Sequence, residues 1–354
     1  MLGGSAANFA VHANNLNKAQ PLTATKLDAQ KPTAMGVSGE TVAASNQAPI
    51  QHTAVKGASG GESFSHVGHQ TCVLHTSVAS DDLGEFVRRK LSEYGVEWSQ
   101  AKARDHQGAC VVLSGSEDRS FVTHRGSAAL FCKEDIDVPR LVESSHIHVA
   151  GFYNCPGLWN DLPDLLAEAK AGGASCSLGP QWDASEEWGG LEPLYGYLDV
   201  FMPNEDEALN ISGCTDVADA ASFFLDKGVG LVVITRGSGG AFAVSRKGAA
   251  GNGGSGGTRD CASRDGGGCF QTTWEQRCAP VKVVDTTGAG DAFSAGFLHV
   301  WKATGGGIGD AQGAKGGDVQ AALRWGCALG TTVVTRVGAS SRLSVEDDIR
   351  PNLA

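Results

Sequence analysis

The chain has 354 residues, 41% hydrophobic and 19% charged, which is enough for one large α/β domain or two ordinary ones. Its net charge is −11 and it has no long run of lysine and arginine, which argues against nucleic acid or an anionic membrane surface as the main partner. The ten cysteines show no zinc-binding spacing, and no apolar run reaches the about 20 residues of a membrane span. We therefore expect free thiols and a cytoplasmic protein, or an organellar one if a transit peptide preceded Met1.

The first predicted elements are a glycine turn and a small-residue helix over residues 1–16. Residues 17–69 lack hydrophobic periodicity and contain few large apolar residues, so we expect a flexible insertion there. A strand at 72–78 and a helix at 82–94 follow. The segment 109–126 has two apolar strands joined by a polar turn, which predicts a β-hairpin.

The rest of the chain alternates strands with helices. The expected strands and helices lie at 146–153, 158–173, 176–179, 197–213, 216–229, 231–244, 290–302 and 318–330. Glycine-rich segments at 249–268 and 304–317 predict two more flexible insertions. Such alternation indicates a mostly parallel sheet covered by helices on both faces, with the hairpin as an appended β flap. Single histidines at 75, 106, 124, 146 and 148 are interpreted as ordinary strand and loop residues.

The stretch VVDTTGAGDAFSAGF at 283–297 places a glycine turn directly before an apolar helix. Glycines let the backbone approach an anion closely, and the amides from Gly288 to Asp291 can point at it together with the helix dipole. Asp291 is then placed to accept a proton from an alcohol that attacks phosphorus. The alternative is a capped helix without chemistry. The stretch is not a Walker loop.

Several motifs occur in a familiar order: GGSAANFAVHANNL (3–16), VASDDLGEFVRRKLSEYGVEW (78–98), MPNEDEA (202–208), VVITRGSGGA (232–241) and DTTGAGDAFSAGF (285–297). Together they resemble the ribokinase-like, or phosphofructokinase-B-type (PfkB), carbohydrate kinase family over 3–16 and 70–345. The resemblance implies a three-layer αβα fold with a mostly parallel central sheet. It also implies a small β lid at about 107–127, within a single domain spanning 1–354.

The same resemblance assigns the catalytic residues. Asp291 would be the base that deprotonates a sugar hydroxyl, and it would also bind the substrate. The amides of Gly288, Ala289 and Gly290 would form an anion hole for the migrating phosphoryl group.

The nucleotide residues also come from the resemblance. Asn204 and Glu207 would lie near the ATP phosphates and Mg²⁺, with Glu207 reaching the metal through water. The residues that would line the nucleotide are Thr235, Gly237, Ser238 and Gly240. Open alternatives are a helix cap with a solvated face for the first pair and an ordinary hairpin turn for the second set.

Two further sites are implied less strongly. Asp285 and Thr287 would help to bind a monovalent cation such as K⁺, with backbone groups near Val333 and Gly338. On the acceptor side, Gly4 would allow close approach of the sugar next to Gly3, and Asn8 would bind a hydroxyl. Arg125 and Gly126 would belong to the lid over the sugar.

Three features depart from the family. Its usual first strand, ending in Gly-x-x-x-x-Asp, is missing from this sequence. The segment 17–69 replaces a short connection, and WGCALG (325–330) stands where many members carry an asparagine near the adenine.

The leading hypothesis is an ATP-dependent phosphotransferase acting on a sugar or sugar-like alcohol, with a small-molecule substrate and a possible homodimer through the lid. The alternatives are a catalytically weak or inactive binding or regulatory protein and a nucleoside kinase of the same fold.

Overall fold

The computed structural model describes most of the chain. The described residues are 5–17, 71–102, 104–114, 119–246, 258–261, 269–307 and 317–353. They all belong to one compact unit, Met1–Ala19 with Gln70–Ala354. Nearly all of the insertion predicted at 17–69, and much of those predicted at 249–268 and 304–317, lies outside the described residues.

Within the described residues, the central sheet has seven strands in the order β10-β11-β9-β8-β7-β6-β5. The parallel half consists of β5 (His146–Ala150), β6 (Ser175–Gly179), β7 (Val200–Phe201) and β8 (Leu231–Thr235). The antiparallel half consists of β9 (Ala241–Arg246), β11 (Cys269–Gln276) and β10 (Thr258–Cys261). The carboxyl ends of the parallel strands therefore share one edge of the sheet, where α/β proteins bind ligands.

Strand β10 differs from the expectation from sequence. It lies inside the segment 249–268, which the composition predicted to be a flexible insertion, and it pairs with β11 just after that segment. The register joins Thr258 to Thr272 and Cys261 to Cys269. Backbone pairing with a long neighbouring strand needs no apolar periodicity, which is why composition missed this element.

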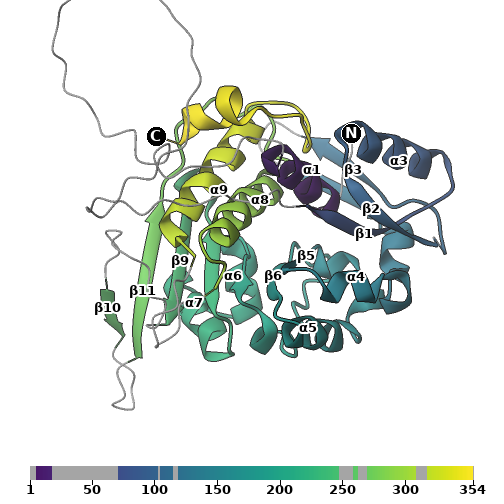
Figure 1. Cartoon of the computed structure of the whole chain (residues 1–354). Helices are drawn as coiled ribbons and strands as arrows, with labels where there is room; N and C mark the ends of the chain where they lie inside the picture. Colours follow the sequence, from purple (N-terminus) through teal and green to yellow (C-terminus); the bar gives the residue numbers. More distant parts are fainter. Residues whose placement is uncertain are drawn as a thin grey trace, which may run out of the picture. The chain divides into compact units, whose positions relative to one another are not determined.

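Helices cover the sheet in two groups, giving the expected three layers (Figure 1). The first group is α1 (Ser5–Asn17), α8 (Ala289–Ala303) and α9 (Val319–Val334), which contact one another and reach β5, β9 and β11. The second is α5 (Leu162–Ala171), α6 (Glu205–Ser212) and α7 (Val217–Asp226), which contact β6, β8 and β9. A large apolar cluster, including Leu166, Phe201 and Phe224, fills the space between this second group and the sheet.

Helices α8 and α9 pack very closely because each carries a glycine at the contact. A Cβ atom at Gly296 would lie 2.7 Å from the carbonyl oxygen of Trp325, and one at Gly326 would lie 2.7 Å from the ring of Phe293. Real Cβ atoms do not approach so closely, so both positions require glycine. This packing fixes the helix that begins at the predicted anion hole.

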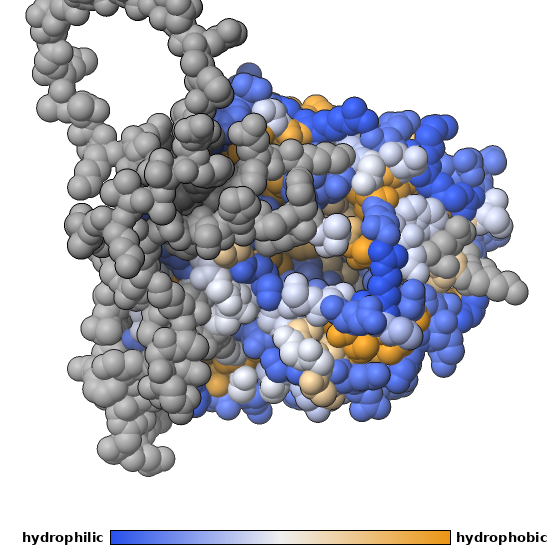
Figure 2. All heavy atoms as spheres, in the orientation of Figure 1, coloured by the Kyte–Doolittle hydropathy of each residue, from blue (hydrophilic) through white to orange (hydrophobic). Residues whose placement is uncertain are grey.

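In the part of the lid region that the structure describes, two small sheets lie apart from the central one. β1 (Val73–Val78) pairs in parallel with β2 (Glu97–Lys102), and α3 (Asp82–Tyr94) connects them. β3 (Ala109–Ser114) and β4 (Arg119–His124) form the predicted hairpin, followed by the short helix α4 (Val138–Val142). The surface over α3 is hydrophilic (Figure 2), whereas the hairpin exposes large apolar side chains.

The histidines of β5 have structural partners. His146 contacts the hydroxyls of Ser175 and Ser177 at 2.8 Å each, and His148 contacts Ser177 at 2.8 Å. Burial lowers the pKa of both imidazoles, to about 3 for His148. Among the described helices, none has the length and apolar character needed to cross a membrane.

Candidate active site

The loop before α8 holds its shape through one carboxylate. Asp285 Oδ1 accepts the backbone amide of Thr287 at 2.9 Å and its hydroxyl at 2.6 Å, and Asp285 Oδ2 accepts the amide of Gly338 at 2.9 Å. The amide of Val284 also donates to Val334 at 2.7 Å. The structure thus brings together the residues predicted to surround a monovalent cation, but protein donors already occupy both oxygens of Asp285.

Gly288 forms the turn from this loop into α8. Its φ is 78°, a left-handed conformation that strains other residues. A Cβ atom there would also lie 2.6 Å from the carbonyl oxygen of Ala339. Two independent constraints, backbone conformation and close approach, therefore require glycine at this position.

The amides predicted to form the anion hole lie at the N-terminus of α8. Helix geometry leaves the first N–H groups without an intrahelical acceptor, and the helix dipole is positive there. The amide of Ala289 donates to Thr286 at 3.3 Å, a long contact. A Cβ atom at Gly290 would meet nothing within 4 Å, so open space adjoins this first turn. The arrangement fits an anion held mainly by Gly288 and Gly290.

Asp291 lies on the same turn and is partly buried. Ser5 donates its hydroxyl to Asp291 Oδ1, and Asn8 Nδ2 donates to Oδ2 at 2.8 Å. Gln181 Nε2 adds a longer contact to Oδ1 at 3.4 Å and also donates to Ser5. The carboxylate therefore has three neutral donors from two distant parts of the chain.

The pKa of Asp291 is raised from 3.8 to about 6. Burial is the main cause because it disfavours the charged form, while the hydrogen bonds from Ser5 and Asn8 partly oppose it. A carboxylate with a pKa near 6 is ionised at neutral pH and is a stronger base than an exposed aspartate.

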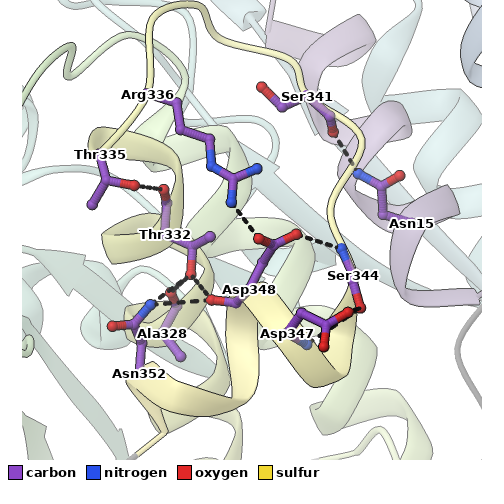
Figure 3. Close-up of polar contacts among 10 residues, drawn as sticks. All are labelled: Asn15, Ala328, Thr332, Thr335, Arg336, Ser341, Ser344, Asp347, Asp348 and Asn352. Carbon is purple, nitrogen blue, oxygen red and sulfur yellow. Dashed lines mark hydrogen bonds and ion pairs between the residues drawn. The ribbon is translucent and has the colours of Figure 1, made fainter.

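The loop after α9 holds the side chain of Asn8 in place on the side away from Asp291. Ser340 donates to Asn8 Oδ1 at 2.7 Å, and Asn15 on the same helix donates to the carbonyl of Ser341 at 2.8 Å. Figure 3 shows how this loop is held at its other end, where Arg336 pairs with Asp348 and the amide of Ser344 donates to Asp348 at 2.7 Å. Helix α1 is thereby tied to the segment that contacts Gly288.

Gln181 follows the carboxyl end of β6 in a strained loop. Its φ is 65°, and Glu186 and Trp188 also have positive φ values of 58° and 55°. Such conformations are uncommon for residues other than glycine and are frequent at functional sites. Asp183 holds the loop by accepting the amides of Ser185 and Trp188 at 2.9 Å each.

Asn204 and Glu207 form a reciprocal cap at the start of α6. Asn204 Oδ1 accepts the amide of Glu207 at 2.8 Å, and Glu207 Oε2 accepts the amide of Asn204 at 3.0 Å. Glu207 is only 7% exposed, and burial raises its pKa from 4.5 to about 7, with a smaller contribution from the negative charge of Asp291. Asn204 and Glu207 therefore do cap α6, but the Glu207 carboxyl is buried rather than on a solvated face, and it lies within electrostatic range of Asp291.

The predicted nucleotide loop follows β8 and adjoins this cap. Thr235 bridges to Asn204, and the turn at Gly237–Gly239 leads into β9. Gly237 has a φ of 54° and Gly240 a φ of 92°. A Cβ atom at Gly237 would meet nothing within 4 Å, whereas one at Gly240 would lie 1.9 Å from the carbonyl oxygen of Gln276. Gly237 and Ser238 thus border open space, while Gly240 packs on the end of β11.

Arg125 and Gly126 lie directly after the hairpin. The amide of Ser127 donates to the carbonyl of His106 at 2.9 Å, and a Cβ atom at Gly126 would lie 2.3 Å from that oxygen. The charge of Arg125 is near enough to lower the pKa of Asp183. The lid therefore approaches the strained loop after β6, while Gly3 and Gly4 lie outside the described residues.

Three polar residues around Asp291 were not identified from the sequence: Ser5, Gln181 and Ser340. Ser5 stands directly after the predicted glycines, and Gln181 follows a parallel strand, so their positions carried a signal. Within the described ranges no group of three or more histidine, cysteine, aspartate or glutamate side chains could hold a metal ion. Mg²⁺ carried by nucleotide phosphates needs only one or two carboxylates, which is the donor set that Glu207 offers.

Comparisons with known proteins give consistent matches. The family model described as pfkB family carbohydrate kinase matches residues 63–346, which leaves α1 outside the match. The fructoselysine 6-kinase of Shigella flexneri is 28% identical over 232 residues, 64% of this chain and 74% of that protein. The ribokinase of Haemophilus influenzae is 26% identical over 310 residues, 83% of this chain and 84% of that protein. The structure of a putative ribokinase II from Escherichia coli with ATP and Mg²⁺ has a TM-score of 0.61 at 23% identity, covering 80% of this chain and 84% of that one.

Proposed function

The chain belongs to the pfkB family of carbohydrate kinases, and we propose that Asp291 is the base that deprotonates its acceptor hydroxyl. The protein is thus an ATP-dependent phosphotransferase acting on a sugar hydroxyl. The observation that carries the role of Asp291 is its contact with Ser5. An alcohol already donates to this carboxylate, at the first turn of a helix whose amides suit an anion.

In the proposed reaction the acceptor hydroxyl takes the place of Ser5 on Asp291. The proton moves to the carboxylate as the acceptor oxygen bonds to the γ-phosphorus, and the bond to the β–γ bridging oxygen breaks to release ADP. The amides of Gly288 and Gly290 stabilise the negative charge on the migrating phosphoryl group. Asn8 and Gln181 hold the carboxylate in position and contact the acceptor.

On the donor side, we assign Asn204 and Glu207 to the phosphates and Mg²⁺. Glu207 would hold the metal through water with its second carboxylate oxygen, since Oε2 accepts the amide of Asn204. Thr235, Gly237 and Ser238 line the nucleotide at the turn next to this cap, and Gly240 packs the turn against the end of β11.

One finer assignment, a monovalent cation site, accompanies this function. K⁺ binds near Asp285 and Thr287 through lone pairs that are not used by Thr287 and Gly338, together with backbone carbonyls of the loop after α9. Replacing K⁺ in the assay by an equal concentration of tetramethylammonium should lower the rate. An unchanged rate would remove the cation from the proposal.

A sugar panel with ATP and Mg²⁺ tests the whole proposal. ADP formation should depend on a sugar such as ribose, fructose, fructoselysine or 2-keto-3-deoxygluconate, and Asp291→Asn should abolish it. Turnover with adenosine or inosine alone would favour the nucleoside kinase alternative. Binding of ADP without turnover of any acceptor would favour a regulatory protein.

A further inference from the structure

The hydroxyl of Ser5 occupies the place on Asp291 that the proposed reaction assigns to the acceptor. Ser5 Oγ donates to Asp291 Oδ1, although the two residues lie 286 positions apart in the chain. Gln181 Nε2 donates to Ser5, and a Cβ atom at Gly151 would lie 4.0 Å from the Cβ atom of Ser5. Hydrogen bonding and packing thus hold a primary alcohol against the carboxylate that we propose as the base.

Two helices bring this alcohol and this carboxylate together. Ser5 is the first residue of α1, and Asp291 lies in the first turn of α8. The two helices contact each other and lie side by side (Figure 1). The amides of Gly288 and Gly290, which we propose to hold the migrating phosphoryl group, belong to the turn that carries Asp291. We therefore expect the Ser5 hydroxyl to lie beside that phosphoryl group when ATP is bound.

We propose that Ser5 is itself a phosphate acceptor when the sugar site is empty, so that the protein phosphorylates its own chain. The step rests on the proposed function, because the phosphate comes from ATP bound at the same site. Ser5 Oγ bonds to the γ-phosphorus and its proton passes to Asp291. The bond between the γ-phosphorus and the β–γ bridging oxygen breaks and releases ADP. The product is a phosphoserine, and Asp291 returns its proton to the solvent.

Ser5 is favoured over other nucleophiles by its position. Among the described residues it carries the only hydroxyl that donates to Asp291, since the other donors are the amides of Asn8 and Gln181. A nucleophile held against its base reacts without the entropic cost of bringing two molecules together. The first turn of α1 contains no acidic residue, so the positive end of this helix favours a phosphate on Ser5.

The experiment incubates the full-length protein with ATP and Mg²⁺ but without sugar and then maps phosphopeptides by mass spectrometry. The tryptic peptide 1–18 contains Ser5 and no other serine, threonine or tyrosine, so phosphate on it identifies the site. We expect labelling of this peptide at a rate per chain that does not depend on protein concentration, because the reaction is intramolecular. Asp291→Asn should slow it by roughly a hundredfold to ten-thousandfold.

Variants of the acceptor residue provide the matched controls. Ser5→Ala should lose the label on peptide 1–18, whereas Ser5→Thr keeps a hydroxyl and should retain it. Ser92→Ala, at an exposed position of α3, should be labelled at Ser5 like wild type.

The modification should also compete with the sugar. A sugar that is turned over should suppress the labelling, because the acceptor displaces Ser5 from Asp291. A phosphate on Ser5 adds about 1.5 to 2 negative charges beside Asp291 and fills the acceptor position. The sugar kinase rate of prelabelled protein should therefore fall in proportion to the labelled fraction and return after phosphatase treatment.

Several results would overturn the proposal. ADP release without phosphate on peptide 1–18 would mean that water is the acceptor. Phosphate that hydroxylamine removes would lie on a carboxyl group, because acyl phosphates react with hydroxylamine and phosphoserine does not. Turnover of a sugar by a protein whose Ser5 stays unmodified with ATP alone would reject self-phosphorylation and leave the proposed function standing. Absence of ADP formation with and without sugars would reject both.

Discussion

Asn8 Nδ2 donates to Asp291 at 2.8 Å, which places a neutral donor directly on the proposed base. The resemblance of the sequence assigned Asn8 to the acceptor, and this contact adds a second role, because the bond favours the ionised form of the carboxylate. Ser340 holds the opposite end of the Asn8 amide at 2.7 Å. The N-terminal helix and the loop after α9 thus act on one carboxylate.

The rate should therefore depend on pH through Asp291. Its pKa of about 6 predicts that kcat/KM rises as the pH increases through 6 and then reaches a plateau. Asn8→Ala removes a donor that lowers this pKa, so the rise should move to higher pH. The control is Asn14→Ala on the same helix, because Asn14 Nδ2 donates to the carbonyls of Tyr94 and Gly95 and not to Asp291 among the described residues. Identical pH profiles for wild type and Asn8→Ala would refute the electrostatic role of Asn8.

Asp291→Asn should remove activity but stabilise the fold at neutral pH. Loss of a general base lowers rates by roughly a hundredfold to ten-thousandfold. Because the folded-state pKa lies above the ordinary value of 3.8, wild type loses stability as the pH rises from about 4 through 6, and the amide does not. Above pH 6 the free energy of unfolding of Asp291→Asn should exceed that of wild type by at most about 3 kcal/mol, since solvent reaches part of the wild-type side chain.

Urea unfolding at acidic and neutral pH measures this gain. The two proteins should be equally stable at acidic pH and diverge at neutral pH. Asp164→Asn, at an exposed position of α5, should change neither activity nor stability. A neutral-pH loss of stability in Asp291→Asn would mean that its hydrogen bonds outweigh the penalty of burial.

Gly288→Ala and Gly290→Ala form a matched pair two residues apart. Gly288→Ala would force alanine into a φ of 78° and place its Cβ atom against the Ala339 carbonyl oxygen. We expect the free energy of unfolding to fall by more than about 1–2 kcal/mol from the backbone conformation alone. Alanine at 290 meets open space, so the fold should keep its stability while the methyl group hinders the anion site. Thermal unfolding and kcat/KM separate the two effects. Equal stability of the two variants would contradict the close approach at Gly288.

The sequence predicted the position of Asp291 on α8 better than it predicted the contacts around Asp291 or the outer strand β10. The spacing in 283–297 was sufficient to place Asp291 at the first turn of α8, since a glycine turn before an apolar helix has few alternatives. The contacts of Ser5 and Gln181 with Asp291 could not be read from spacing, because the residues lie 286 and 110 positions away from it in the chain. Strand β10 was missed because glycine-rich composition gives no sign of backbone pairing.

The apolar hairpin provides a test of assembly. Val111, Leu113, Phe121 and Val122 are 56–61% exposed on β3 and β4, an unusual density for a two-stranded sheet. We expect a second copy of the chain to cover them, so Leu113→Lys should convert a dimer to a monomer in light-scattering measurements. Leu83→Lys, at an exposed position on α3, is the control. A wild-type protein that is monomeric at all concentrations would contradict this prediction.

Glu207→Gln tests the donor side of the site. The pKa of about 7 means that wild-type Glu207 takes up a proton as the pH falls through neutrality, so its contribution to Mg²⁺ binding should fade over that range. The amide cannot ionise, so the variant should need more Mg²⁺ for half-maximal rate above pH 7 and approach wild type below it.

The fold of Glu207→Gln should be more stable than that of wild type above pH 7, because an ionised buried carboxylate disfavours the folded state. Glu205→Gln, in the first turn of the same helix, is the control. Mg²⁺ dependence that is the same in wild type and Glu207→Gln at high pH would leave Glu207 only as a helix cap.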